Sequence, residues 1–241
     1  MILVHAEKCN GCGICVDYCT VGAIRLDGRL AVIDPERCTD CYVCLRNVVC
    51  RLKALDKGPL EAFADIFGHV LSDPTETTAE TGVPGRGTEE AKTNDVTGRV
   101  RPGEVGVAID MGRPGVGVFL RDVEKVAKAV CAAGLVLEPG DVSPLGKVLK
   151  DLRTGEMLPE VRHKYLLSII IEGKTTLDRF PEVIKALRAI EGRIDTVFSV
   201  GIILRVDDEG HHPLIDRLSE SGLPRPIRGK VNVGLGRPRA G

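Results

Sequence analysis

One pattern occurs twice near the start of the chain. It reads Glu7-Lys8-Cys9-Asn10-Gly11-Cys12-Gly13-Ile14-Cys15 and, 29 residues later, Glu36-Arg37-Cys38-Thr39-Asp40-Cys41-Tyr42-Val43-Cys44. A fourth cysteine follows each copy, Cys19 after the first and Cys50 after the second. Short apolar segments flank each copy, and this arrangement predicts a strand, a cysteine loop and a short helix used twice. We therefore expect a small domain with pseudo-twofold symmetry.

The cysteines are crowded into this repeat, since eight of the nine lie between Cys9 and Cys50. A secreted disulfide scaffold is usually a short chain with a secretion signal. The start of this chain, residues 1–5, has no basic region and no long apolar stretch, so we expect no signal peptide and a cytoplasmic location. Structural zinc needs four ligands per site and seldom uses so compact a run. Iron–sulfur ligation is the favoured interpretation.

The spacing Cys9-x2-Cys12-x2-Cys15-x3-Cys19 is typical of [4Fe–4S] binding. With the second run, residues 1–57 resemble the bacterial two-cluster ferredoxins. The resemblance implies two [4Fe–4S] clusters, each with four cysteine ligands. One cluster would take Cys9, Cys12, Cys15 and Cys50, and the other Cys38, Cys41, Cys44 and Cys19.

Two departures from that family pattern stand out. Thr20 and Arg51 occupy the positions where proline usually follows the fourth cysteine. The gap before Cys50 is two residues longer than usual, so we expect an unusual environment at the first cluster. Cys131, by contrast, lies beside Val130 on a predicted apolar helix, and we interpret it as a buried small side chain rather than a catalytic thiol.

The fold class expected for the whole chain is α+β. After the ferredoxin domain (1–57) come a short helix and polar linker (58–104), an α/β sandwich (105–207) and a basic tail (208–241). The helix is expected over 59–67. In the sandwich we expect strands at 105–110, 135–137, 165–172 and 196–206, a helix capped by Asp122 that ends at Gly134, and a helix that Asp178 and Pro181 begin and Gly192 stops. This βαββαβ order is typical of a ferredoxin-like sandwich and resembles ACT-type regulatory or dimerisation modules.

Four further features allow a plain and a functional interpretation. The loop Gly112–Gly117 is either a tight connection or an anion site that uses Arg113. The polar segment 85–99 is a surface linker or a segment that docks on a partner or lines a site. His211-His212 is expected to cap the last helix rather than bind metal. The tail from Gly222 has five basic residues and no acid, which suits a solvated tail or docking on an acidic partner.

Composition excludes several classes. The chain has 33 Lys and Arg against 34 Asp and Glu, which disfavours a nucleic-acid binder. No apolar run approaches the ~18–20 residues that span a bilayer. Hydrophobic residues make up 43% of the 241, enough for a core.

The sequence therefore predicts an iron–sulfur electron-transfer subunit of a cytoplasmic oxidoreductase, whose catalytic partner carries the chemistry. A flavoprotein is one candidate for that partner. No catalytic residue is identified, and a homodimer through the sandwich is an option. Two alternatives remain open. One is a component that adds part of a substrate site, since the linker resembles ferredoxin-linked reductases of the 6-hydroxynicotinate reductase type. The other is a redox- or ligand-sensing regulator built on the ACT-like half.

Overall fold

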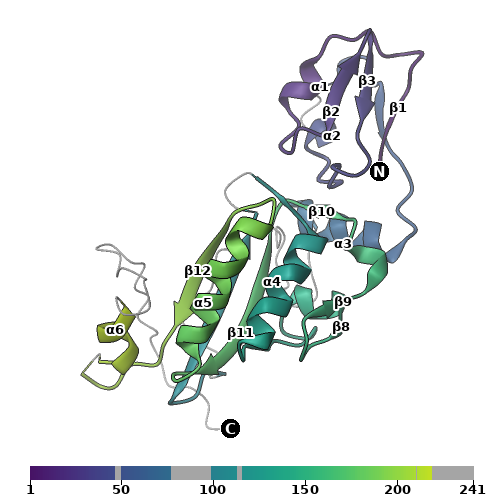
Figure 1. Cartoon of the computed structure of the whole chain (residues 1–241). Coiled ribbons are helices and arrows are strands. Elements are labelled where there is room, and N and C mark those ends of the chain that lie inside the picture. Colours follow the sequence, from purple (N-terminus) through teal and green to yellow (C-terminus); the bar gives the residue numbers. More distant parts are fainter. Residues whose placement is uncertain (47–49, 77–98, 113–115, 210, 219–241) are drawn as a thin grey trace.

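The computed structural model describes residues 1–46, 50–76, 99–112, 116–209 and 211–218. A small cysteine-rich unit holds the amino terminus, and a larger unit of one sheet and two long helices follows it (Figure 1). None of the helices in these ranges is long and apolar enough to cross a membrane.

The cysteine-rich unit contains each repeat as strand, helix and strand. Its elements are β1 (Ile2–Val4), α1 (Ile14–Asp17), β2 (Ile24–Asp27), β3 (Leu30–Ile33), α2 (Val43–Arg46) and β4 (Leu55–Lys57). The two outer strands, β1 and β4, pair antiparallel, and so do the two inner ones, β2 and β3. Each repeat therefore supplies one strand to each hairpin-like ladder, which gives the expected pseudo-twofold arrangement.

Helix α3 (Phe63–Ser72) links the two units. It starts and ends later than the 59–67 predicted from the sequence. Its buried residues Ala64, Phe67 and Leu71 belong to the core of the larger unit, so packing rather than Pro59 sets its position. Lys164 reinforces this contact, because its Nζ lies 2.6 Å from a carboxylate oxygen of Asp65.

The larger unit is built on a four-stranded antiparallel sheet. Its strands are β5 (Glu104–Met111), β7 (Val136–Leu137), β11 (Ile169–Thr176) and β12 (Phe198–Ile203), and they lie in the order β12-β5-β11-β7. Helices α4 (Leu120–Ala132) and α5 (Phe180–Ile190) pack side by side over the sheet (Figure 1). Along the chain these elements follow one another as βαββαβ.

The core of this unit lies between the sheet and the two helices. Alternate residues of β5 point into it and are at most 1% exposed: Val105, Val107, Ile109 and Met111. The helices contribute side chains three or four positions apart, such as Val123 with Val126 and Val183 with Leu187. This apolar spacing is the pattern from which the sequence predicted both helices.

The prediction that Asp122 caps α4 is wrong. The helix begins at Leu120, two residues before Asp122, and the residue in the cap position is Phe119. The buried Asp122 carboxylate instead lies 2.7 Å from Lys125 Nζ and accepts a hydrogen bond from the Asp195 amide. Tertiary contacts therefore use the side chain that the sequence suggested for a cap.

The strand predicted at 165–172 is two strands. β10 (Tyr165–Leu166) leaves the sheet and pairs with β6 (Val118–Phe119), while β11 starts at Ile169 opposite Met111. The apolar run is continuous because both pieces are buried, although they pair with different strands. Two further short strands, β8 (Leu149–Asp151) and β9 (Glu156–Met157), form a hairpin whose turn spans residues 152–155.

The glycine-rich loop begins and ends with left-handed glycines, Gly112 (φ 88°) and Gly117 (φ 77°). A Cβ on Gly117 would collide with the Tyr165 ring. The amides that an anion would need at the start of α4 are already used, since Leu120 N donates to Lys164 O and Arg121 N to Arg162 O. These contacts fit the interpretation of the loop as a tight connection. Arg113, the residue expected to help bind an anion, lies outside the described residues.

The carboxy-terminal segment includes α6 (Pro213–Arg217). His212 caps it, because its Nδ1 accepts a hydrogen bond from the Leu214 amide at 3.1 Å, which confirms the capping prediction. Burial lowers the pKa of His212, which favours the neutral ring that this bond requires. The structure does not describe residues 77–98 and 219–241, so the polar segment up to residue 98 and the basic tail from Gly222 lie outside the described residues.

We predict that Phe180→Ala lowers the free energy of unfolding by about 3–5 kcal/mol, because a fully buried ring leaves a cavity in the core. Phe180 is 0% exposed. Urea unfolding of the full chain, followed by circular dichroism, measures the change. Phe63→Ala is the matched control, since that ring is 47% exposed. Equal losses in the two variants would contradict this account of the core.

Candidate metal centres

The structure gathers four cysteines around a first cavity of about 210 Å³. Cys9, Cys12 and Cys15 come from the first cysteine loop and Cys50 from the end of the second. Apolar side chains complete the wall, among them Ile14 and Leu26. This is the set of four that the sequence analysis assigned to one cluster.

The other four cysteines line a second and much tighter cavity, of about 20 Å³. They are Cys38, Cys41 and Cys44 of the second loop and Cys19 of the first. Each cavity thus takes three cysteines from one repeat and one from the other. Four convergent sulfur atoms form the donor set that iron–sulfur clusters use, so the residues present fit such a group at each cavity.

Backbone amides face the sulfur atoms of three of these cysteines. Ala23 N donates to Cys19 Sγ at 3.1 Å and Ala54 N to Cys50 Sγ at 3.2 Å. The Ala31 amide donates to Cys9 Sγ at 3.4 Å. Such contacts orient the ligands and offset negative charge on sulfur.

The longer gap before Cys50 leaves the local geometry of that cysteine unchanged. In both repeats the fourth cysteine accepts from the amide four residues later, and the residue before that amide is left-handed. That residue is Gly22 in the first copy and Lys53, with φ 51°, in the second. The two extra residues of the second repeat lie between Cys44 and Cys50, where residues 47–49 are outside the described residues.

The two cysteine loops share one backbone path but differ in sequence. Gly11 and Gly13 have φ of 73° and 79°, in the left-handed region that glycine adopts without strain. A Cβ at Gly11 would lie 2.7 Å from Arg29 Cα. The equivalent residues of the second loop are Asp40 (φ 54°) and Tyr42 (φ 56°). Left-handed backbone at a residue with a Cβ costs roughly 1–2 kcal/mol, so other contacts must hold this loop.

Helix α3 and its neighbours supply those contacts. The buried His69 lies with its Nδ1 2.8 Å from the Asp40 carbonyl, and its ring packs on Tyr42 with centroids 4.6 Å apart. Arg46 donates both to the Cys41 carbonyl and to the Asp73 carboxylate. The sequence analysis did not identify His69, Arg46 or Asp73 as functional residues. The available signal was the absence of glycine at 40 and 42, which implies external support for the loop.

His69, Asp73 and Glu76 also place three possible metal ligands within 4.8 Å of one another. The Asp73 carboxylate already accepts hydrogen bonds from Arg46 and from the amide and hydroxyl of Thr75. Burial acts to raise the pKa of Asp73, but the hydrogen bonds from Thr75 and then the Arg46 guanidinium hold it below its usual range. These side chains therefore join α3 to the second cysteine loop rather than forming a metal site.

Burial raises the pKa of three of the cavity thiols. Desolvation, with the Asp40 carboxylate, raises the pKa of Cys38 to about 11. Desolvation, with the neighbouring cysteines, raises the pKa of Cys44 to about 12. Desolvation and the proximity of Cys12, Cys9 and Cys50 likewise raise the pKa of Cys15. A cation is needed before these groups can hold negative charge, so metal binding here would release protons.

Cys131 stands apart from both sets. It is half-buried on α4, and its Sγ lies 3.8 Å from the Leu152 carbonyl oxygen. Burial raises its pKa to about 11, which keeps the thiol protonated and unreactive at neutral pH. This agrees with its interpretation as a small buried side chain.

Comparisons with known proteins bear on the amino-terminal segment. Residues 2–25, which include Cys9, Cys12, Cys15 and Cys19, match the family model described as 4Fe-4S binding domain. A curated relative, the "Ferredoxin-like protein in nif region" of Sinorhizobium fredii (strain NBRC 101917 / NGR234), is 47% identical over 38 residues. That stretch is 16% of this chain and 59% of the relative's length. No solved structure matches the chain significantly. The amino-terminal segment is thus similar to 4Fe–4S ferredoxins, which supports an iron–sulfur electron-transfer role.

Proposed function

We propose that the chain relays single electrons by means of two [4Fe–4S] clusters to a partner subunit that carries the chemistry of an oxidoreductase. The observation that carries this proposal is the convergence of eight cysteines into two separate sets of four. When bound, each cluster accepts or gives one electron at a time.

The two cavities support one set of four ligands for each cluster. Cys9, Cys12, Cys15 and Cys50 would hold the first cluster, and Cys19, Cys38, Cys41 and Cys44 the second. The chain contributes more than these sulfur atoms. Amides of Ala23, Ala31 and Ala54 point at three of them, and apolar side chains line the first cavity. These are the protein features that tune cluster potentials.

The larger unit would provide docking or dimerisation, as in the ACT-type modules that its βαββαβ order resembles. Its strand β12 lies at the edge of the sheet, next to β5 alone among the described strands. An edge strand offers unpaired backbone groups to another chain. A flavoprotein subunit is one partner that would complete such an assembly.

The metal content tests the proposal directly. We expect about eight iron and eight acid-labile sulfide per chain after anaerobic purification, because each of two cubes holds four of both. Colorimetric assays of iron and sulfide measure this. About four of each would leave one site unfilled, and zinc in place of iron would remove the proposed function.

A second prediction concerns Cys50. Replacing it with alanine should remove one ligand of the first cluster and leave the second cluster unchanged. Electron paramagnetic resonance should show one perturbed or three-iron cluster beside one intact cube. Cys131→Ala is the control, since that thiol lines neither cysteine cavity. Two unaltered cubes in the Cys50 variant would mean that another group serves that iron.

A third prediction separates a carrier from a catalytic component. The purified full chain should take electrons from a strong reductant and pass them to a redox dye, yet turn over no organic substrate. Turnover should appear only when a partner subunit is added. Substrate turnover by the chain alone would favour the reductase alternative, in which this chain builds part of the substrate site.

A further inference from the structure

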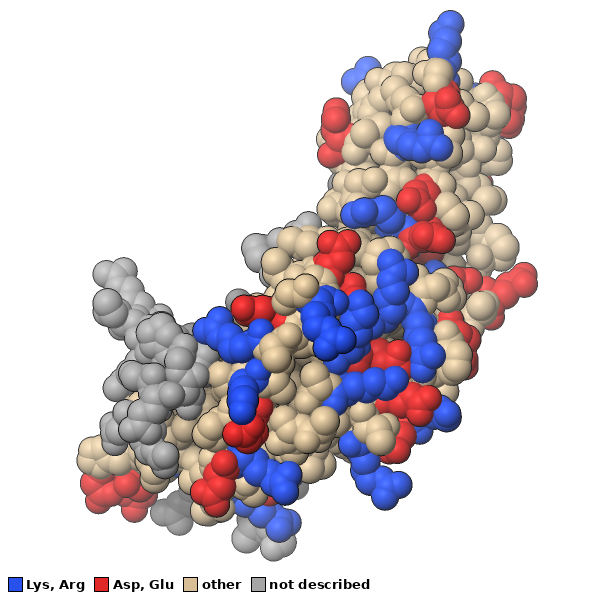
Figure 2. Space-filling view, viewed as in Figure 1, with Lys and Arg blue, Asp and Glu red and all other residues tan. Residues whose placement is uncertain are grey.

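The described surface holds a group of basic side chains between the second cysteine set and α4. We call it the basic face, and it consists of Arg37, Arg121, Lys125, Lys128 and Arg162. Figure 2 shows Lys and Arg side chains gathered over the α4 region of the larger unit. Arg121, Lys125 and Lys128 are exposed and follow one another at helical spacing.

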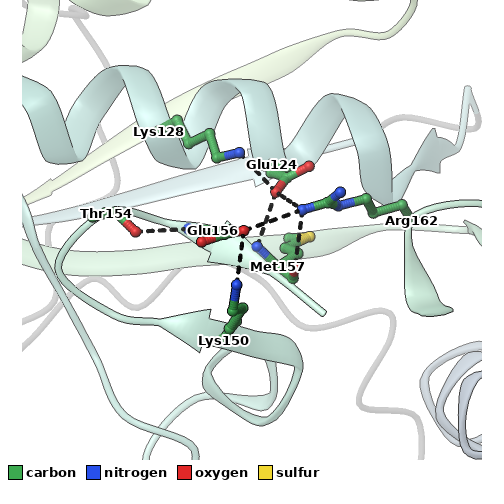
Figure 3. Close-up of polar contacts among 7 residues, drawn as sticks. All are labelled: Glu124, Lys128, Lys150, Thr154, Glu156, Met157 and Arg162. Carbon is green, nitrogen blue, oxygen red and sulfur yellow. Dashed lines mark hydrogen bonds and ion pairs between the residues drawn. The ribbon is translucent and has the colours of Figure 1, made fainter. Parts of the chain in front are cut away.

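The acidic partners of these cations lie beneath them. Lys128 and Arg162 converge on Glu124, at 3.0 and 2.8 Å, and Figure 3 shows this arrangement. The Glu124 side chain is only 10% exposed, while those of Lys128 and Arg162 are 47% and 34% exposed. The same holds for Lys125 over the buried Asp122. The charges of Glu124 and Asp122 are thus covered, while the cations above them face the solvent. Glu156, 3.8 Å from Arg162, is the partly exposed acid of this group, at 36%.

Two of the five cations pair with no carboxylate among the described residues. Arg37 lies over the Tyr165 ring at 5.3 Å, and Arg121 lies over the Phe119 ring at 3.8 Å. The two rings meet edge to face with centroids 4.7 Å apart. No carboxylate among the described residues therefore offsets the charge of either guanidinium group, and the aromatic contacts hold both groups in position.

The same rings adjoin the second cysteine set. Tyr165 forms a small apolar cluster with Val21 and Ala23, and Cys19, Cys38 and Phe119 pack against it. Arg37 is also the residue directly before Cys38. The basic face thus begins where Tyr165 of the larger unit packs against Val21 and Ala23, which line the second cavity, and it continues along α4.

We propose that the basic face is the docking surface for a small acidic electron-carrier protein. The inference rests on the proposed function and adds the chemistry of one partner and its place on the chain. Charge complementarity identifies the partner, because cations with buried counter-charges attract an acidic surface and steer its approach. The ring contacts bring that partner beside the second cysteine set rather than the first.

The test measures binding of an oxidised flavodoxin, as the acidic probe, to the iron-loaded full chain by isothermal titration calorimetry. The double variant R121E/K125E should weaken binding at least about tenfold at low ionic strength, because two attractions become repulsions. The difference should shrink near 0.5 M salt, where exposed charges are screened within about 4–5 Å. Cytochrome c, a basic probe of similar size, should show the opposite change.

Arg153→Glu is the matched control. Its side chain is 93% exposed and lines a cavity with Cys131 and Gly134, at the far end of α4 from Arg121. It should leave flavodoxin binding within about twofold of the wild type. Equal losses in this control and in the double variant would overturn the assignment of the face.

Two further outcomes separate this inference from others. If a duplex DNA probe binds as tightly as flavodoxin and loses affinity in the same variant, the face recognises polyanions in general and the proposal falls. Iron and sulfide are assayed in every preparation. A chain without clusters removes the proposed function, whereas a fully loaded chain with unchanged flavodoxin binding in the double variant removes this inference alone.

Discussion

The fold of the amino-terminal unit depends on bringing eight thiols into two tight groups. Its apolar core is small, and among the described residues the fully apolar side chains in it are few: Ile2, Ile24, Ala31 and Leu55. Cys15 and Cys44 belong to the same cluster, so the cysteines complete a core that would otherwise be thin. Units of this size usually need a metal or cross-links for stability. The raised pKa values of Cys15, Cys38 and Cys44 disfavour their thiolate forms, and a bound metal would offset that cost, which links folding of this unit to metal binding.

The two cysteine loops tolerate their left-handed backbone in different ways. The first loop uses Gly11 and Gly13, which take the left-handed backbone without strain. The second places Asp40 and Tyr42 at the equivalent positions, and the roughly 1–2 kcal/mol for each must come from elsewhere. His69 and Arg46 hold that loop from outside. The two repeats are similar in sequence but are stabilised differently. The first loop relies on its glycines, and the second relies on contacts with α3.

Local patterns account for what could be predicted. The cysteine spacing, through the resemblance to two-cluster ferredoxins, indicated both sets, and each set lines its own cavity in the structure. The apolar spacing along α4 and α5 indicated two helices with one buried face each. Contacts between distant segments account for the rest. Asp122 has the features of a cap, yet Lys125 and the Asp195 amide engage it. The apolar run from Tyr165 reads as one strand, since sequence alone does not show that its first two residues pair with β6.

Helix α3 makes the second site part of both units. Ala64, Phe67 and Leu71 bury one side of it in the core of the larger unit, while His69 reaches the Asp40 carbonyl and the Tyr42 ring. A shift of α3 would therefore move the backbone that carries Cys38 and Cys41. The residues that line both cavities lie within the amino-terminal unit, but Tyr165 of the larger unit packs against Val21 and Ala23, which line the second cavity. A partner or ligand that displaces the larger unit would consequently act on the environment of the second cysteine set and leave that of the first nearly unchanged.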